Sequence, residues 1–235
     1  MPEWVYGVVD RDAPEPAGEQ GIDGAAVRLI GAGPLAALAS TVPGERFGED
    51  ALKVALEDVE RLEALARGVV VPFRLCTIYE DEGRVREMLE REPLEDALDR
   101  LRGTEEWGVK AYRADPAEAA AAPAARSGAE YLRRKRDERE SAEAAREAVE
   151  ERAAAIHTRL AAHAREAALS RPHDRRLSGD EREMLLNGAY LVPLERADGF
   201  REVVEALDRE HAPHGVRLEL TGPWAPYHFV AEAPA

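Results

Sequence analysis

One long segment without helix-breaking residues, 127–170, constrains what this chain can fold into. It contains no Pro, and no Gly after its second residue, and it is rich in Ala, Glu and Arg, which are strong helix formers. Ser127 can cap its start, and Glu130, three residues later, completes a capping box. Pro172 disfavours helical backbone at the residue before it. The segment therefore predicts a helix over 127–170, which at 1.5 Å per residue would be about 60 Å long.

Large apolar side chains are sparse in this predicted helix and share one narrow face. Val149, Ile156 and Leu160 lie on it, and the rest of the face is mostly Ala. Such a stripe suits packing in a helical hairpin or against a partner. Two interpretations stay open: the helix packs on its own domain, or it is an arm whose three apolar residues contact a partner. Charged side chains such as Arg146 and Glu150 are most simply a solvated surface.

The part of the chain before the long helix alternates between strand and helix patterns. The sequence predicts strands over 4–10, 26–30, 35–42, 69–79 and 105–113, and helices over 49–67, 82–91 and 93–103. Pro72 cannot donate a ladder hydrogen bond, so it marks a sheet edge or a bulge. This order predicts an α+β sandwich of the ferredoxin-like type as the N-terminal domain over 1–114.

A low-complexity stretch over 115–126, DPAEAAAAPAAR, predicts a linker between two domains. After the long helix, the patterns predict a strand over 185–194, a helix from Asp198 and a strand over 216–221. We therefore expect a C-terminal small α+β domain over 127–235 that carries the long helix. The fold class expected for the whole chain is α+β with two domains.

The end of the chain, GPWAPYHFV, is rich in aromatic residues and Pro. One interpretation is a rigid turn that closes the second core, because buried aromatic rings supply much core energy in small domains. The other is an exposed anchor for a partner, since Trp and Tyr are frequent interface hot spots. The first interpretation is favoured, and Trp224 and Tyr227 remain candidate partner-binding residues.

The sequence carries no strong catalytic or metal-binding motif. There is no Gly-x-Gly-x-x-Gly after a strand that leads into a helix, no phosphate loop and no His-Glu-x-x-His. His211 and His214 flank a helix end near Glu210, but the spacing is weak for a metal site, so a surface or capping role is favoured. We therefore expect no catalytic residues, no cofactor and no metal.

Two residues in the predicted strand over 69–79 raise narrower questions. Cys76 is better explained as a small buried apolar residue than as a nucleophile. Arg74 alternates with apolar residues, and a buried Arg needs a partner. Glu105 or Glu106 could supply that partner, which would be a structural role.

The charge balance excludes several classes of partner. The formal net charge is −15, which argues against binding to nucleic acid or to an acidic membrane surface. No run of about 18 apolar residues is present, so we expect no membrane insertion. The single cysteine excludes an intrachain disulfide, and the N-terminus lacks the pattern of a signal peptide. A cytoplasmic protein is expected.

Motifs spread over the chain resemble those of the gas vesicle protein F/L family. In order they are VYGVV, VVPFRLCTIY, EWGVKAY, SGAEYL at the start of the long helix, LNGAYLV and LTGPWAPYHFV. The family more often has Phe and Gly at the positions of Leu75 and Cys76, and often a second Pro at Ala225. These departures are mild, and they assign no special role to the three residues.

The resemblance implies two α+β domains, the first ferredoxin-like and the second with a long helical arm. It also implies an accessory protein of gas vesicle formation that binds the hydrophobic shell protein and other accessory proteins, without catalysis or cofactor. A sheet edge near Pro72, the Ala-rich helix face and the segment with Trp224 are the candidate contacts. A ligand-sensing α+β module, with a defined pocket, and an enzyme are the alternatives.

Overall fold

The computed structural model describes residues 1–42, 71–74, 76–91, 94–114, 128–172 and 182–230. The chain divides into two compact units, Met1–Glu106 with Pro223–Ala235, and Trp107–Gly222. These boundaries differ from those expected at 114 and 127, because strand β6 (Thr104–Arg113) continues into the sheet of the second unit and the C-terminal segment belongs to the first. The predicted linker and the predicted helix over 49–67 lie outside the described residues.

The first unit is built on an antiparallel sheet around β1. Its strands are β1 (Glu3–Asp10), β2 (Val27–Ala32), β3 (Leu35–Thr41), β4 (Val71–Pro72) and β5 (Ile78–Tyr79). The order is β2-β3-β1-β4, and β5 also pairs with β1. A two-residue turn joins β2 to β3, and Gly33 in it has a φ of 55°, which glycine adopts without steric cost.

Burial on both faces makes β1 the centre of the first unit. Trp4, Tyr6 and Val9 belong to one apolar cluster, which also contains Ile22 from a short turn before β2. Helix α3 (Glu82–Arg91) packs on β2 and β3, and α4 (Leu94–Leu101) packs on β4. Both helices present buried apolar residues at helical spacing, as the sequence predicted.

The predicted strand over 69–79 is wrong as a single element, because the chain turns between β4 and β5. Pro72 cannot continue the ladder, and the backbone N–H and hydroxyl of Thr77 both donate to the carbonyl of Arg74, at 3.3 and 2.8 Å. Cys76 lies in this turn with a φ of 67°. The placement of β4 at the end of the strand order agrees with the edge position predicted from Pro72.

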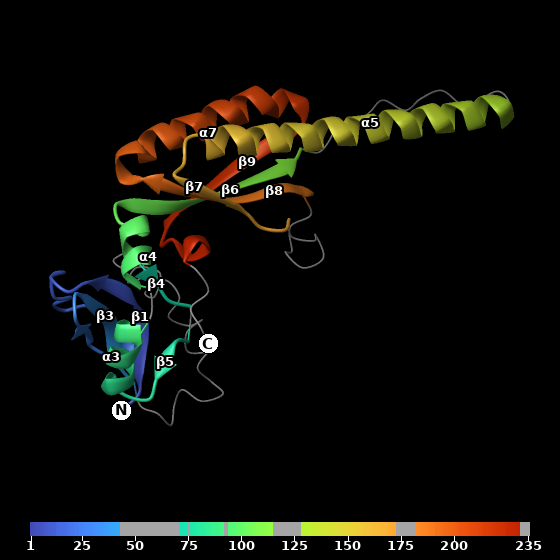
Figure 1. Cartoon of the computed structure of the whole chain (residues 1–235). Helices are drawn as coiled ribbons and strands as arrows, with labels where there is room; N and C mark the ends of the chain where they lie inside the picture. Colours follow the sequence, from blue (N-terminus) through green and yellow to red (C-terminus); the bar gives the residue numbers. More distant parts are fainter. Residues whose placement is uncertain (43–70, 75, 92–93, 115–127, 173–181, 231–235) are drawn as a thin grey trace. The chain divides into compact units, whose positions relative to one another are not determined.

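The second unit has the element order β-α-β-β-α-β. Its elements after β6 are α5 (Gly128–Ala161), β7 (Glu166–Leu169), β8 (Met184–Pro193), α7 (Ala197–His211) and β9 (Val216–Trp224), and the sheet order is β7-β8-β6-β9. Figure 1 shows α5 and α7 side by side over one face of the sheet. The core lies between these layers and includes Trp107 of β6, Tyr190 of β8 and Phe200 of α7.

The long helix is shorter at its C-terminal end than the sequence predicts. Helix α5 ends at Ala161, and residues 166–169 form β7, which pairs antiparallel with β8. The Ala-rich composition favours helix there, but the backbone of Glu166–Leu169 is satisfied by a ladder with a strand distant in sequence. Tertiary pairing therefore overrides local propensity at this end.

Candidate partner-binding surfaces

The apolar face of α5 is occupied by the core of its own unit. Ile156 and Leu160 are 0% exposed and Val149 is buried beside them, within the cluster that includes Tyr190 and Phe200. Of the two interpretations left open by the sequence, this burial favours a helix that packs on its own sheet. A partner could reach these three side chains only if the second unit opened.

The C-terminal aromatic segment belongs to the first unit, not to the second core that the sequence favoured. Ala225 and Phe229 are buried, whereas Trp224 is half-buried and Tyr227 is 41% exposed. A short 3-10 turn over Tyr227–Phe229 sets this division, because it points successive side chains in different directions. One aromatic residue of this segment thus packs inside while Tyr227 offers a ring to the solvent.

A buried carboxylate holds this segment in place. Glu106 is only 3% exposed, and its Oε2 accepts a hydrogen bond from the backbone N–H of His228 at 2.9 Å. Its Oε1 lies 2.7 Å from Nδ1 of the same histidine. The guanidinium of Arg100 donates to the carbonyl oxygen of Phe229. These groups fix the turn that carries Tyr227 against the start of β6.

The electrostatics of this attachment depend on His228. Its hydrogen bond to Glu106 raises the pKa of His228, and this effect outweighs the opposing effect of partial burial. The sequence suggested Glu106 as a possible partner for Arg74. In the structure Arg74 is exposed, and both oxygens of Glu106 contact His228. A carboxylate in a buried strand was the available signal, but its partner lies 122 residues away along the chain.

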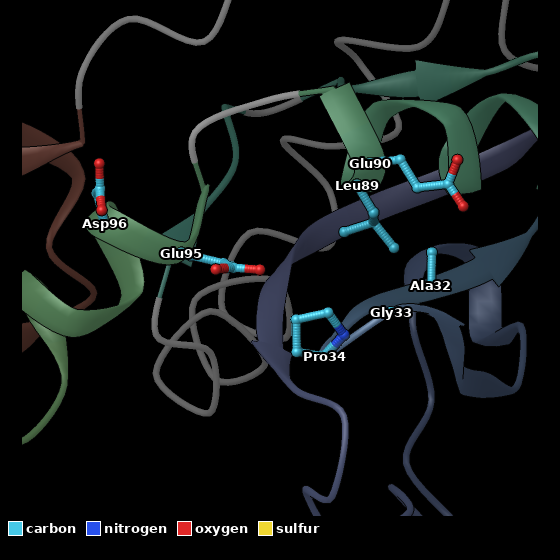
Figure 2. Close-up of a pocket in the computed structure, with 7 residues that line it drawn as sticks. All are labelled: Ala32, Gly33, Pro34, Leu89, Glu90, Glu95 and Asp96. Atoms are coloured by element: carbon cyan, nitrogen blue, oxygen red, sulfur yellow. The ribbon is translucent and has the colours of Figure 1, made fainter.

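A cavity of about 430 Å³ lies in the first unit between the β2–β3 turn and helices α3 and α4. It is lined by Ala32, Gly33, Pro34, Leu89, Glu90, Glu95 and Asp96. Figure 2 shows the carboxylate of Glu95 directed toward Pro34, while those of Glu90 and Asp96 point elsewhere. The acidic groups therefore do not converge on one point, as a ligand-sensing pocket with defined polar contacts would require.

His211 is buried, which corrects the surface role expected for it. It is the last residue of α7, and its Nδ1 has no hydrogen-bond partner among the described residues. Burial lowers the pKa of His211. Glu210 is 3.8 Å from its Nε2 but accepts a hydrogen bond from Arg159 at 2.7 Å. Within the described ranges, no three His, Cys, Asp or Glu side chains are grouped as metal ligands would be.

Cys76 is half-buried against the apolar cluster of the first unit. Burial raises the pKa of its thiol, which lowers the fraction of reactive thiolate near neutral pH. This environment agrees with the interpretation of Cys76 as a small packing residue. In the described part of the chain, no helix has the length and apolar character needed to span a bilayer.

Comparison with known proteins gives matches over nearly the whole chain. Residues 3–231 match the family described as Gas vesicle synthesis protein GvpL/GvpF. Gas vesicle protein L of Streptomyces sp. (strain CB03234) is 37% identical over 253 aligned positions, which cover 98% of this chain and 93% of that protein. Gas vesicle protein F of the same strain is 32% identical over 254 positions, which cover 98% of this chain and all of that protein.

The fold is also similar to that of solved structures. The crystal structure of GvpF from Anabaena sp. PCC7120 superposes with a TM-score of 0.70 at 20% identity, covering 99% of this chain and 97% of that one. GvpF from Microcystis aeruginosa gives a TM-score of 0.67, also at 20% identity. Sequence motifs, full-length matches and fold agree, and the chain belongs to the GvpL/GvpF family of gas vesicle synthesis proteins.

Proposed function

We propose that this protein is an accessory protein of gas vesicle assembly that binds the hydrophobic shell protein and other gas vesicle proteins in the cytoplasm, without catalysis. The observation that carries the proposal is the family match over residues 3–231. The charge of the chain supports it, because a net charge of −15 would keep a complex with an apolar, aggregation-prone subunit dispersed.

We propose in addition that both units are variants of the ferredoxin-like fold. The two sheets have the same strand order, β2-β3-β1-β4 in the first unit and β7-β8-β6-β9 in the second. If the strands of each sheet are numbered 1 to 4 along the chain, both orders read 2-3-1-4. The second unit also has the β-α-β-β-α-β element order of that fold. In this proposal α5 is the first crossover helix of the second unit, extended at its N-terminal end.

The C-terminal segment is the surface that we assign to the shell protein. Tyr227 is 41% exposed and Trp224 is half-buried, whereas the apolar face of α5 is covered by its own sheet. The turn around Tyr227 is held by Glu106 and Arg100, so the ring is presented at little entropic cost on binding. Rigid aromatic residues of this kind are frequent hot spots.

The test starts from a strain that normally forms gas vesicles and from which this gene has been deleted. We measure whether each variant of the gene restores the vesicles. We expect wild-type protein to restore flotation, and the double variant Trp224→Ala/Tyr227→Ala to give a vesicle yield at least about tenfold lower, as loss of two hot-spot contacts implies. Leu194→Ala is the matched control, because Leu194 is a large apolar residue exposed elsewhere, in the second unit.

Two outcomes distinguish the proposed assembly role from the proposed contact at the C-terminal segment. If vesicles form normally in the strain that lacks the gene, the assembly role is wrong. If the gene is needed but the double variant, present at wild-type levels, restores vesicles fully, the role stands and the C-terminal segment is not the contact.

A further inference from the structure

The described side chains in the N-terminal half of α5 do not contribute to the core of their own unit. Figure 1 shows this part of the helix extending beyond the sheet. Among the side chains of α5 that the structure describes, Val149 is the first buried one, and those of residues 132–148 are exposed. We call residues 132–148 the arm. Isolated helices of this length are only marginally stable in water, so the charges of the arm strongly affect its stability and its contacts.

Charge along the arm is divided into a basic block and an acidic block. Residues 133–139 have the sequence RRKRDER, and residues 140–147 have the sequence ESAEAARE. A neighbouring helix with the reverse order of charges would therefore be attracted along the length of the arm.

One face of the arm carries the two blocks in sequence. Arg136, Arg139, Glu143 and Glu147 follow at spacings of three, four and four residues, so they lie along one face. In the described part of the chain no hydrogen bond or ion pair engages these four side chains. Arg146 and Glu150, seven residues after Arg139 and Glu143, lie on the same side of the helix and already pair within one copy, where Arg146 donates to Glu150 at 2.9 Å. Neighbouring like charges on the four-residue face repel each other within one copy.

We propose that two copies of this chain associate through antiparallel pairing of their arms, with the two-fold axis near Ser141. In this register Arg139 of one copy faces Glu143 of the second copy, and Arg136 faces Glu147. Each contact occurs twice, since a two-fold interface is isologous. The pairing joins Arg136 and Arg139, which have no printed ion pair within one copy, to an acidic residue each, and it does not depend on the proposed function.

Parallel pairing is excluded by the same charges. It would place the basic block of one copy against the basic block of the other. In the antiparallel pair, eight residues separate Ser141 from Val149 in each copy, so the parts of the two helices that pack on their own sheets begin about 24 Å apart. That distance is about three Debye lengths at physiological ionic strength, so repulsion between charges on those packed parts is screened.

The expected dimer is weak and sensitive to salt. Exposed ion pairs contribute about 0–1 kcal/mol each, and the arm offers no apolar seam. Association should therefore appear at high protein concentration in about 50 mM salt and disappear in about 0.5 M salt, where the Debye length falls below about 5 Å.

Charge reversal gives a test with its own internal rescue, read by sedimentation velocity in about 50 mM salt. We expect Arg136→Glu/Arg139→Glu to be monomeric, because all four pairing residues become acidic. We expect Glu143→Arg/Glu147→Arg to be monomeric, because all four pairing residues become basic. An equimolar mixture of the two variants should form a one-to-one complex at least as tight as the wild-type dimer.

The matched control for Glu143→Arg/Glu147→Arg is Glu202→Arg/Glu205→Arg, which makes the same charge change on exposed positions of α7. It should dimerise like the wild type, and circular dichroism should show full helix content in all variants. The proposal is overturned if the wild type is monomeric in low salt at all concentrations. It is equally overturned if either arm variant alone dimerises like the wild type, or if the mixture fails to associate.

Discussion

Replacing Leu160 with Ala is expected to lower the free energy of unfolding of the second unit by about 3 kcal/mol. Leu160 is 0% exposed and lies in the cluster formed by α5, the sheet and α7. The substitution removes buried methyl groups and leaves a cavity that close-packed neighbours fill only in part. Denaturation by urea, followed by circular dichroism, measures the loss.

The matched control is Leu132→Ala in the same helix. Leu132 is 68% exposed, so we expect its substitution to change the free energy of unfolding by less than about 0.5 kcal/mol. A loss of stability for Leu132→Ala equal to that for Leu160→Ala would contradict this account of the helix. So would a variant at Leu160 with full stability but reduced capture of a partner, because the face would then be a docking surface.

Substitution of His228 by Ala is expected to loosen the C-terminal segment by about 1–3 kcal/mol, since it removes a hydrogen-bond partner from a buried carboxylate. Glu106 is 3% exposed, and its Oε1 lies 2.7 Å from Nδ1 of His228. Hydrogen exchange of residues 225–230 should become faster. His214→Ala, at an exposed histidine in the second unit, should leave this exchange unchanged. Unchanged exchange in His228→Ala would contradict the attachment.

The same attachment should weaken as pH rises. The pKa of His228 is raised above its ordinary value of 6.5 in the folded state. The stability from its bond to Glu106 is therefore fully present below about pH 6.5 and is lost as pH rises through the raised pKa. Exchange of residues 225–230, corrected for the intrinsic effect of pH, should increase from about pH 6 to pH 8 in the wild type. His228→Ala should remove that dependence, and a flat wild-type profile would contradict it.

His211 should act in the opposite direction, in the second unit. Its pKa is lowered mainly by burial, so the stability that comes from its neutral form is present above about pH 6.5 and is lost as pH falls. The two histidines would partly cancel in a global melting curve. A measurement confined to the C-terminal segment therefore separates their effects.

Local patterns in the sequence predict the elements that have an apolar face of their own. Helix α3, helix α7 and strand β8 lie close to the predicted ranges, because each repeats apolar residues at the period of its own structure. The end of α5 could not be predicted in this way. The residues of β7 favour helix, and only pairing with β8 makes them a strand.

The candidate contacts show the same limit. Helical spacing identifies Val149, Ile156 and Leu160 as one apolar face. The same face is expected whether the helix packs on a partner or on the chain's own sheet, so the pattern does not distinguish the two. The composition of the C-terminal segment indicates a turn with buried aromatic residues. The composition does not indicate in which unit these aromatic residues are buried. Their attachment to the first unit includes hydrogen bonds to the carboxylate of Glu106, which is distant in sequence.

Capture of the gas vesicle shell protein by this chain tests the central proposal most directly. The tagged full-length protein is co-expressed with the shell protein and purified by affinity, beside a tagged unrelated acidic protein of similar size. The account predicts that the shell protein is retained by the wild type and by Leu194→Ala, and that Trp224→Ala/Tyr227→Ala retains about tenfold less. If the shell protein is retained no better than by the unrelated protein, even with the other accessory proteins present, the chain does not bind it and the proposal is wrong.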